Sequence, residues 1–272
     1  MATSAAGATL SEANRAAQLA ARAGSLQELV RLWSIVDIEN LPGTIDTFAR
    51  AAAILAGQGF GQSAGAAAEY YSLFRRVEGI GSLIVPLASA PSIAVMMGLL
   101  RGAALKGILD GRRAGMTLGA AGRQGLIKTA GQLTKLVLAG GRQTIIGATQ
   151  TDPRALGWAR FTSGDPCAFC RSLAARGPVY KSEKSSDFMP HDHCACMPEP
   201  VYRGAPEAVG VVKQSADYAA EFRDAQAWAR ASGTMSQDTS NNALNNYRRW
   251  LDNGKPSASG ATDGGNAGNN GE

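Results

Sequence analysis

The chain has 272 residues, and 45% hydrophobic with 18% charged residues is typical of a globular protein of one or two domains with a buried core. Few aromatic residues beside 33 glycines predict helices that pack closely through small side chains. The net charge of +5 is spread along the chain without a basic run, so nucleic-acid binding is permitted but not indicated. The first residues lack a basic segment followed by an apolar one, so no secretory signal is expected.

Residues 1–150 are predicted to be helical throughout. A capping box at Ser25 to Glu28 predicts a helix that restarts after Gly24, and Pro42-Gly43 is expected to end it. The next helix is expected to begin at Thr44 and to be interrupted by a glycine-rich break before residue 66. A period of 3.6 residues predicts a core of apolar side chains on this helix and on two later helices: Ile45, Phe48, Ala52, Leu55, Ile93, Met97, Leu100, Ala104, Ile108, Leu126, Ala130, Leu133 and Val137.

Gly79 to Leu100 contains no charged residue and needs a test as a membrane span. Pro86 and Pro91 lie five residues apart, and prolines at that spacing would break a single helix. We therefore expect a buried loop followed by the start of a helix, and no contact with a membrane.

The pattern changes after Asp152-Pro153. Short β-like runs at 158–162, 178–180 and 195–201 predict a compact α+β module, and weak amphipathic patterns near 218–231 and 240–251 predict two further helices. From Asn253 the chain is too polar to bury a core, so a disordered tail is expected. The predicted fold is mainly α, with a helical body over 1–150, an α+β module over 151–205, a helical extension over 206–252 and a tail over 253–272.

All four cysteines and both histidines fall between residues 167 and 196. The C-x-x-C pair Cys167 and Cys170 can supply two thiolates from one turn, and H-x-x-C-x-C can supply imidazole and thiolate from a second. Two disulfides or a redox C-x-x-C are the alternatives, but they suit a small secreted domain or a βαβ setting, and neither is indicated. The spacing predicts a structural zinc site.

The predicted metal ligands are Cys167, Cys170, His191, Cys194 and Cys196, which are five candidates for four tetrahedral positions. Cys167 and Cys170 are the firmest, because the flanking residues favour a turn into a short helix. Cys196 follows Cys194 on the same face of an expected strand and is either the fourth ligand or a buried thiol beside the site. His193 is the most expendable. A closed shell of four ligands leaves no position for water, so the metal is expected to hold the fold.

No catalytic residues are assigned. Gly61 to Gly65 matches G-x-S-x-G around Ser63, but it lies in a helical stretch without the strand that a nucleophile elbow requires. The only histidines are inside the metal window, so a serine or cysteine nucleophile lacks a base. Ser182, Ser185 and Ser186 lie among Lys181 and Lys184 and leave a serine-lysine dyad as an alternative, although the segment is more typical of a solvated loop. The metalloprotease motif H-E-x-x-H is absent. The glycine run 115–125 indicates close helix packing better than a phosphate cradle.

Several motifs resemble one known family over roughly residues 141–202: Gly141-Arg-Gln-Thr-Ile145, Asp152-Pro153, Trp158-Ala-Arg-Phe161, Pro166-Cys-Ala-Phe-Cys170, Ala174-Ala-Arg-Gly177, Val179-Tyr180, His191-Asp-His-Cys194-Ala-Cys196 and Pro200-Val201. They are similar to the MuF-like minor head proteins of tailed phages. The closest likeness is to the actinobacteriophage branch, often labelled capsid maturation protease. The family's C-x-x-C and H-x-x-C-x-C pattern falls on the five candidate ligands.

The resemblance implies a virion protein that acts in head morphogenesis, in the head interior or near the portal, and in the host cytoplasm during assembly. It implies the portal and major capsid proteins as partners, with packaged DNA as a further one, and no small-molecule substrate. The alternatives are a capsid maturation protease and a zinc-dependent nucleic-acid-binding protein.

Overall fold

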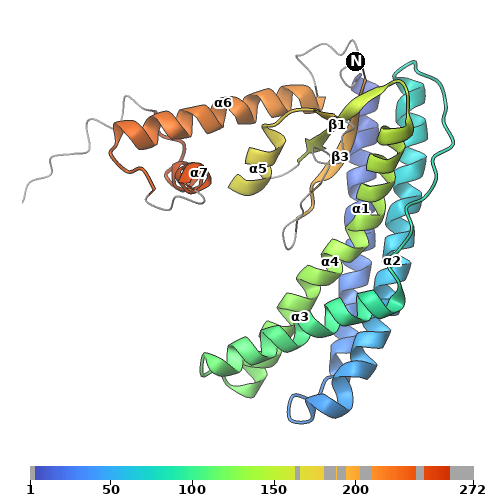
Figure 1. The fold of residues 1–272 in the computed structure, drawn as a ribbon, viewed down its shortest axis with the longest axis vertical. Coiled ribbons are helices and arrows are strands. Elements are labelled where there is room, and N and C mark those ends of the chain that lie inside the picture. The colour runs from blue at the N-terminus through green and yellow to red at the C-terminus, as the bar shows by residue number, and fades with distance from the viewer. Residues whose placement is uncertain are drawn as a thin grey trace, which may run out of the picture.

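The computed structural model describes residues 4–162, 166–180, 188, 194–202, 210–236 and 242–257. In these residues the chain is mainly helical with one small sheet, which confirms the predicted fold class. The helical body consists of α1 (Ala5–Leu32), η1 (Trp33–Ile35), α2 (Leu41–Val77), α3 (Ile93–Arg113) and α4 (Leu118–Thr151). A smaller unit with β1 (Ala155–Phe161), α5 (Ala168–Ala174), β2 (Val179–Tyr180) and β3 (Met197–Tyr202) lies at one end of the body (Figure 1).

Helix α4 is at the centre of the body and packs against α1, α2 and α3. Glycines let the helix backbones approach closely: a Cβ at Gly140 would overlap the carbonyl oxygen of Phe60, and one at Gly125 would collide with Ile108. The close packing expected from composition and from the glycine run is therefore present. Most of the predicted periodic positions are buried: Ile45, Phe48, Ala52, Leu100, Ala104, Ile108, Leu133 and Val137. Leu55, Met97, Leu126 and Ala130 are half-buried, and the prediction is wrong for Ile93, which is exposed at the start of α3.

Helices α1 and α2 are both continuous, so the predicted restart at Ser25 and the glycine-rich break after Leu55 are wrong. Ser25 is buried inside α1 and its hydroxyl donates to the Ala21 carbonyl, where it cannot cap a helix. Gly59 faces Ser25 and Val137, and no Cβ would fit there. Such glycines allow contact between helices, and that contact offsets the roughly 1 kcal/mol by which each weakens an isolated helix.

The turn between α1 and α2 also differs from the prediction. Helix α2 has Asn40 at its N-cap position and Pro42 in its first turn, where a proline costs no hydrogen bond. Thr44 is not the cap; its hydroxyl donates to the Asn40 carbonyl.

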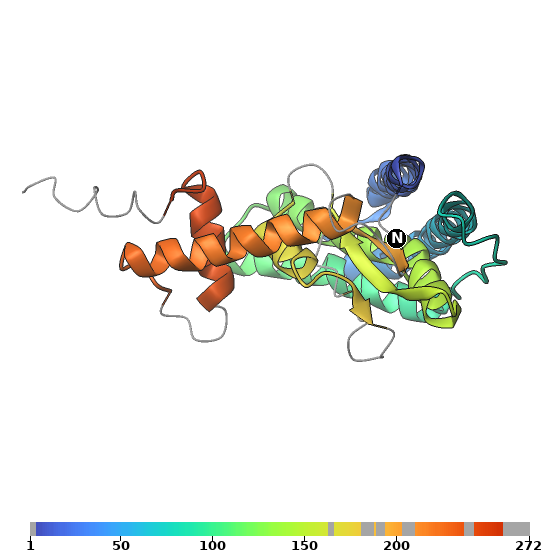
Figure 2. The ribbon, with the colours of Figure 1, turned by 90° about the horizontal axis from the view of Figure 1, so that it is seen from above.

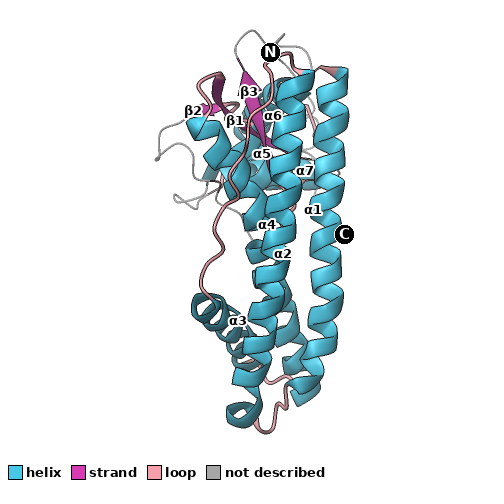
Figure 3. Cartoon of the chain, turned by 90° about the vertical axis from the view of Figure 1, so that its right-hand side faces the viewer, coloured by secondary structure: helices cyan, strands magenta, loops and turns pink. Residues whose placement is uncertain are grey.

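The segment between α2 and α3 runs down the side of the body as an extended strap (Figure 3). The expected buried loop is wrong, because most of residues 79–92 are exposed and Ile84 is 95% exposed. The expected helix start is confirmed: the Ser92 hydroxyl accepts from the Val95 amide at the beginning of α3. No helix in the described ranges is both long and apolar enough to pass through a lipid bilayer.

The predicted strands are confirmed as an antiparallel sheet in the order β2-β1-β3. One face of β1 carries Ala159, which packs with Val201 and with Val211 of the helix α6 (Gly210–Ala231). The other face carries Trp158, which packs against the cysteines. Strand β3 contains Pro198 and Pro200, which an edge strand tolerates because proline has no amide to donate.

Helices α6 (Gly210–Ala231) and α7 (Asn242–Asp252) confirm the two expected amphipathic helices and extend away from the body (Figure 2). Tyr247 and Trp250 of α7 pack against Ala168 of α5. The chain after α7 remains attached for a few residues, because the Lys255 ammonium lies 2.6 Å from Glu221. The expected disorder is therefore wrong for residues 253–257, and residues 258–272 lie outside the described residues. The division into domains stays a prediction.

A buried ion pair joins the body to the sheet. Asp152 is fully buried at the end of α4 and accepts two hydrogen bonds from the Arg75 guanidinium, at 2.7 and 3.1 Å. The Tyr71 and Tyr202 hydroxyls also donate to this carboxylate, at 3.0 and 3.4 Å. Arg75 reaches further, to the carbonyls of Gly81 and Ser82 in the strap. The Arg75–Asp152 pair therefore joins four parts of the chain, namely α2, the strap, the end of α4 and β3.

Candidate metal centre

Three of the predicted ligands converge in the structure. The sulfur atoms of Cys170, Cys194 and Cys196 all lie within 4.8 Å of one another and are buried. The Cys170 and Cys194 sulfurs are 3.7 Å apart, well beyond a disulfide bond of about 2.05 Å. Zinc bonds of about 2.3 Å in a tetrahedron put neighbouring sulfurs about 3.8 Å apart. The three thiols therefore have the spacing of three corners of a tetrahedral metal site.

The short helix α5 positions Cys170. Cys167 is its N-cap residue in extended conformation, and the Arg171 amide donates to the Cys167 carbonyl to close the first turn. The Arg171 guanidinium also donates to the Pro166 carbonyl and pairs with Glu221 of α6, which fixes the helix against its neighbour. The predicted turn into a short helix is confirmed.

The segment before β3 positions the other two cysteines. Cys194 and Cys196 do not lie in a strand as expected, but in the irregular chain that enters β3. Their carbonyls accept hydrogen bonds from Arg142 of α4, at 2.6 Å for Cys194 and 3.1 Å for Cys196. The helical body therefore holds this segment in place.

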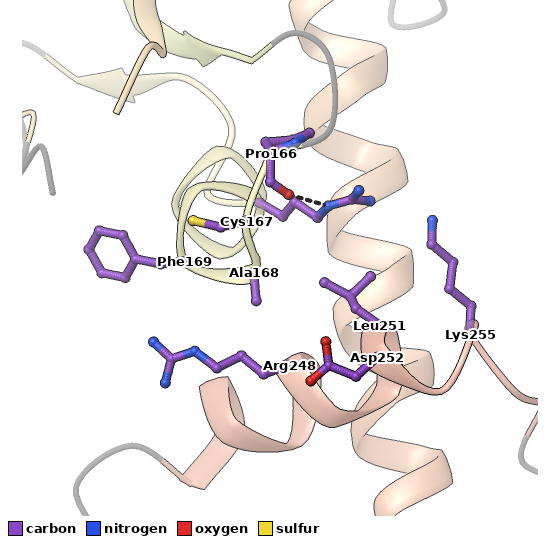
Figure 4. Close-up of a pocket in the computed structure, with 9 residues that line it drawn as sticks. Pro166, Cys167, Ala168, Phe169, Arg248, Leu251, Asp252 and Lys255 are labelled. Atoms are coloured by element: carbon purple, nitrogen blue, oxygen red, sulfur yellow. Dashed lines mark hydrogen bonds between the residues drawn. The ribbon is translucent and has the colours of Figure 1, made fainter. Parts of the chain in front are cut away.

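Cys167 is not in the group of three. It is exposed at the start of α5 and lines a cleft of about 830 Å³ between α5 and α7, with Arg248 and Leu251 on the opposite side (Figure 4). His191 and His193 lie outside the described residues. The fourth ligand, from Cys167 or His191, stays a prediction.

Two arginines, Arg142 and Arg160, flank the thiols. Neither was predicted as a site residue from the sequence. Arg142 and Arg160 are 2% and 3% exposed, and the Arg160 guanidinium lies 3.9 Å from the Cys194 sulfur. Both cations lie over the Phe188 ring, at 4.8 Å for Arg142 and 3.8 Å for Arg160, and Arg160 also donates to the Phe188 carbonyl. Trp158 packs on the same ring, with 5.4 Å between centroids. The cluster is therefore enclosed by aromatic rings and two positive charges.

The surroundings favour an ionised sulfur. Hydrogen bonds from the Cys170 and Cys196 thiols, helped by the nearby Arg142 charge, lower the pKa of Cys194. The same contact with Cys194 raises the pKa of Cys170. Burial lowers the pKa of Arg142 to about 10, so this side chain remains a cation at neutral pH. A hydrogen bond with Cys170 lowers the pKa of Cys196, but contact with Cys194 and burial outweigh it and raise that pKa. Soft divalent metals bind thiolates, and Cys194 is the sulfur whose ionised form the surroundings favour.

The serine of the G-x-S-x-G match has a structural role. Ser63 is fully buried in α2, its hydroxyl donates to Gln18 of α1, and it accepts from the Gly141 amide of α4 at 2.8 Å. It joins three helices of the body and is not accessible to a substrate. The other serines considered as nucleophiles, Ser182, Ser185 and Ser186, lie outside the described residues.

The fold and the site together define a mainly helical protein whose carboxy-terminal α+β unit gathers buried thiols. The family model described as VG15 protein matches residues 1–225, which include the helical body, the sheet and all four cysteines. The chain belongs to the VG15 protein family, a family of phage proteins. Searches of curated proteins and of solved structures gave no match.

Proposed function

We propose that this chain is a minor head protein of the MuF-like kind, a structural component of the phage particle that acts in head morphogenesis. Membership in a phage family over residues 1–225 supports a virion role. The motifs that resemble MuF-like proteins also gather in space, because Arg142, Asp152, Trp158 and Arg160 surround the cysteines or join them to the body. The proposed partners are the portal protein and the major capsid protein.

The metal in this proposal is zinc. Three thiols spaced for a tetrahedron between buried cations are the observation that carries it. Cys170, Cys194 and Cys196 would hold the ion, and Cys167 or His191 would complete the shell. Zinc suits thiolate and imidazole ligands and has no redox chemistry of its own. Its contribution there is to link α5 to the segment before β3.

The maturation protease alternative receives less support. Ser63 is buried between helices, so the one nucleophile that matched a protease motif cannot meet a peptide bond. We therefore assign the chain a structural role in the head.

Mass spectrometry of purified phage particles tests the head assignment. We expect peptides of this chain in particles, because a minor head protein stays with the mature capsid. A particle without them would contradict a virion role. A phage with Ser63→Ala serves as the control for proteolysis: major capsid protein that remains unprocessed only in this phage would favour the protease.

Contact with DNA is a second candidate function, and the distribution of charge favours it. The expectation of evenly spread charge is wrong for residues 79–151, which contain eight lysines and arginines and one acidic residue, Asp110. The hairpin of α3 and α4 brings Arg112, Arg113 and Arg123 together as exposed side chains near its tip. Figure 1 shows that tip projecting from the lower end of the body. Clustered cations of this kind bind phosphates without regard to base sequence.

A salt titration of duplex DNA binding tests this candidate. We expect affinity to fall steeply with salt. The triple change of Arg112, Arg113 and Arg123 to alanine should reduce the slope by about one for each phosphate that the protein no longer neutralises. Arg31→Ala on α1, also exposed, is the matched control and should leave the slope unchanged. Binding that is absent at low salt, or unaffected by the triple change, would remove this function from the hairpin.

A further inference from the structure

Arg142 is a cation that the helical body contributes to the cysteine cluster. Its Nε and Nη2 atoms donate to the carbonyls of Cys196 and Cys194, at 3.1 and 2.6 Å. Its Nη1 atom is buried without a hydrogen-bond partner in the part of the chain that the structure describes. A guanidinium has five N–H donors, and a buried donor left without an acceptor is costly. The Nη1 group of Arg142 therefore requires a further acceptor besides the two cysteine carbonyls.

The electrostatic surroundings identify that acceptor. Arg142 pairs with no carboxylate in the described residues. The ionisable groups beside it are the thiols of Cys194 and Cys196, whose carbonyls it binds, and that of Cys170, which lies within 4.8 Å of them. Arg160, the second buried cation, adds a repulsive charge at the same place. Two buried guanidinium groups this close together require anionic partners nearby, because an unpaired buried charge is strongly unfavourable. Ionised sulfur atoms are the groups present to fill that role.

The two arginines offset the negative charge of a loaded site, fully for four thiolates and with one positive charge left over for three thiolates and one imidazole. A divalent metal with three thiolates and one imidazole carries one negative charge, and with four thiolates it carries two. Arg142 and Arg160 together supply two positive charges next to it. An outer group that donates to a metal ligand orients that ligand and tunes its bond to the metal.

The position of Arg142 is fixed by the body. It follows Gly140 and Gly141, which have no room for a side chain because they abut Phe60 of α2 and Gln18 of α1. The backbone of Arg142 cannot follow the cysteine segment if that segment moves, so α4 acts as a fixed anchor point for the segment.

We propose that Arg142 is the positioning residue that couples metal binding in the α+β unit to the helical body. Its guanidinium neutralises the anionic metal site, and its Nη1 atom donates to a metal-bound thiolate. This inference rests on the proposed metal centre and adds to it the residue through which the body stabilises bound metal.

The test measures metal affinity in the full-length protein, by competition titration with zinc and by the absorption spectrum with cobalt. Arg142→Met removes the charge and all donors, and we expect zinc affinity to fall about 10- to 100-fold, the usual effect of removing such a partner. Arg142→Lys keeps the charge without the fork of donors and should restore part of that loss. The sulfur-to-cobalt charge-transfer band should shift in both variants, because a hydrogen bond to a thiolate changes the energy of its electrons. Gln143→Met, exposed on the same helix, is the matched control and should match the wild type.

A purely structural Arg142 would behave differently. It would lower the stability of metal-free and metal-bound protein equally, and the rise in melting temperature on adding zinc would stay the same. Our proposal requires that rise to shrink in Arg142→Lys, which is the variant to use if Arg142→Met does not fold. Unchanged zinc affinity and an unchanged cobalt band in Arg142→Lys would overturn the role of Arg142 and leave the metal centre standing. A wild-type protein that does not bind zinc would overturn the centre itself.

Discussion

Removal of zinc with a chelator is expected to unfold the α+β unit while α1 and α2 stay folded. The core around the thiols is small, with Trp158, Phe188 and the three cysteines as its buried members in the described residues. The body has a larger core of its own, built from α1 to α4. Binding of a structural zinc supplies on the order of 10 kcal/mol of folding free energy, more than such a small core can replace. Hydrogen exchange read by mass spectrometry should show reduced protection in β1, α5 and β3.

Elemental analysis and ligand variants complete this test. We expect about one zinc per chain in the wild type, because the site has the size of a single tetrahedral ion. Cys170→Ser should lower both zinc content and solubility. Comparison of Cys167→Ser with His191→Ala should show which of the two is the fourth ligand, because the true ligand lowers zinc content. A metal-free protein that melts at the wild-type temperature would contradict the structural role of the metal.

The change Asp152→Asn is expected to lower the free energy of unfolding by about 3 to 5 kcal/mol, the usual effect of breaking a buried ion pair. The variant leaves the Arg75 guanidinium buried without its carboxylate, and it weakens the hydrogen bonds from Tyr71 and Tyr202. Urea unfolding followed by circular dichroism measures the loss. Asp46→Asn is the matched control: its pair with Arg101 is exposed, and the free energy should change by no more than about 1 kcal/mol.

The same variant has a pH signature. Burial alone would raise the pKa of Asp152, but the hydrogen bonds from Arg75, from the Arg154 amide and from Tyr71 outweigh it and hold the pKa below its ordinary value. A lowered carboxyl pKa contributes stability that is complete above the unfolded-state value of about 3.9 and is lost as the pH falls towards the folded-state value. The stability difference between wild type and Asp152→Asn should therefore shrink below about pH 4. A difference that stays constant down to about pH 2 would show that the carboxylate charge is not what stabilises the junction.

The sequence predicted the types of element well and their boundaries less well. Apolar side chains at a period of 3.6 residues identify a buried helix face whatever its neighbours are, and Phe48, Leu100 and Val137 are buried as expected. A glycine gives no such signal. Gly59 lies inside a continuous helix and packs against Val137, whereas Gly79 follows the end of α2 with a φ of 71°. The residue type alone does not distinguish a glycine that allows helix packing from one that ends a helix.

The cysteine site was predictable in part, because ligand spacing within a turn is a local property. Cys170, Cys194 and Cys196 meet as that spacing indicated. Arg142 comes from a helix 52 residues before Cys194, and nothing in its local pattern distinguishes it from a surface arginine. Its presence in the motif Gly141 to Ile145 that resembles the MuF-like family was the one available signal.

The two prolines of β3 have a consequence for association between copies of the protein. Pro198 and Pro200 lie opposite Arg160 and Trp158 of β1 at alternate positions. A proline nitrogen cannot donate to β1, so both nitrogens lie on the side of β3 away from β1. That side of β3 lacks two backbone N–H donors, so a strand from another molecule cannot form a regular series of hydrogen bonds with it. Strand addition between copies of the protein is therefore disfavoured at the β3 edge of this sheet.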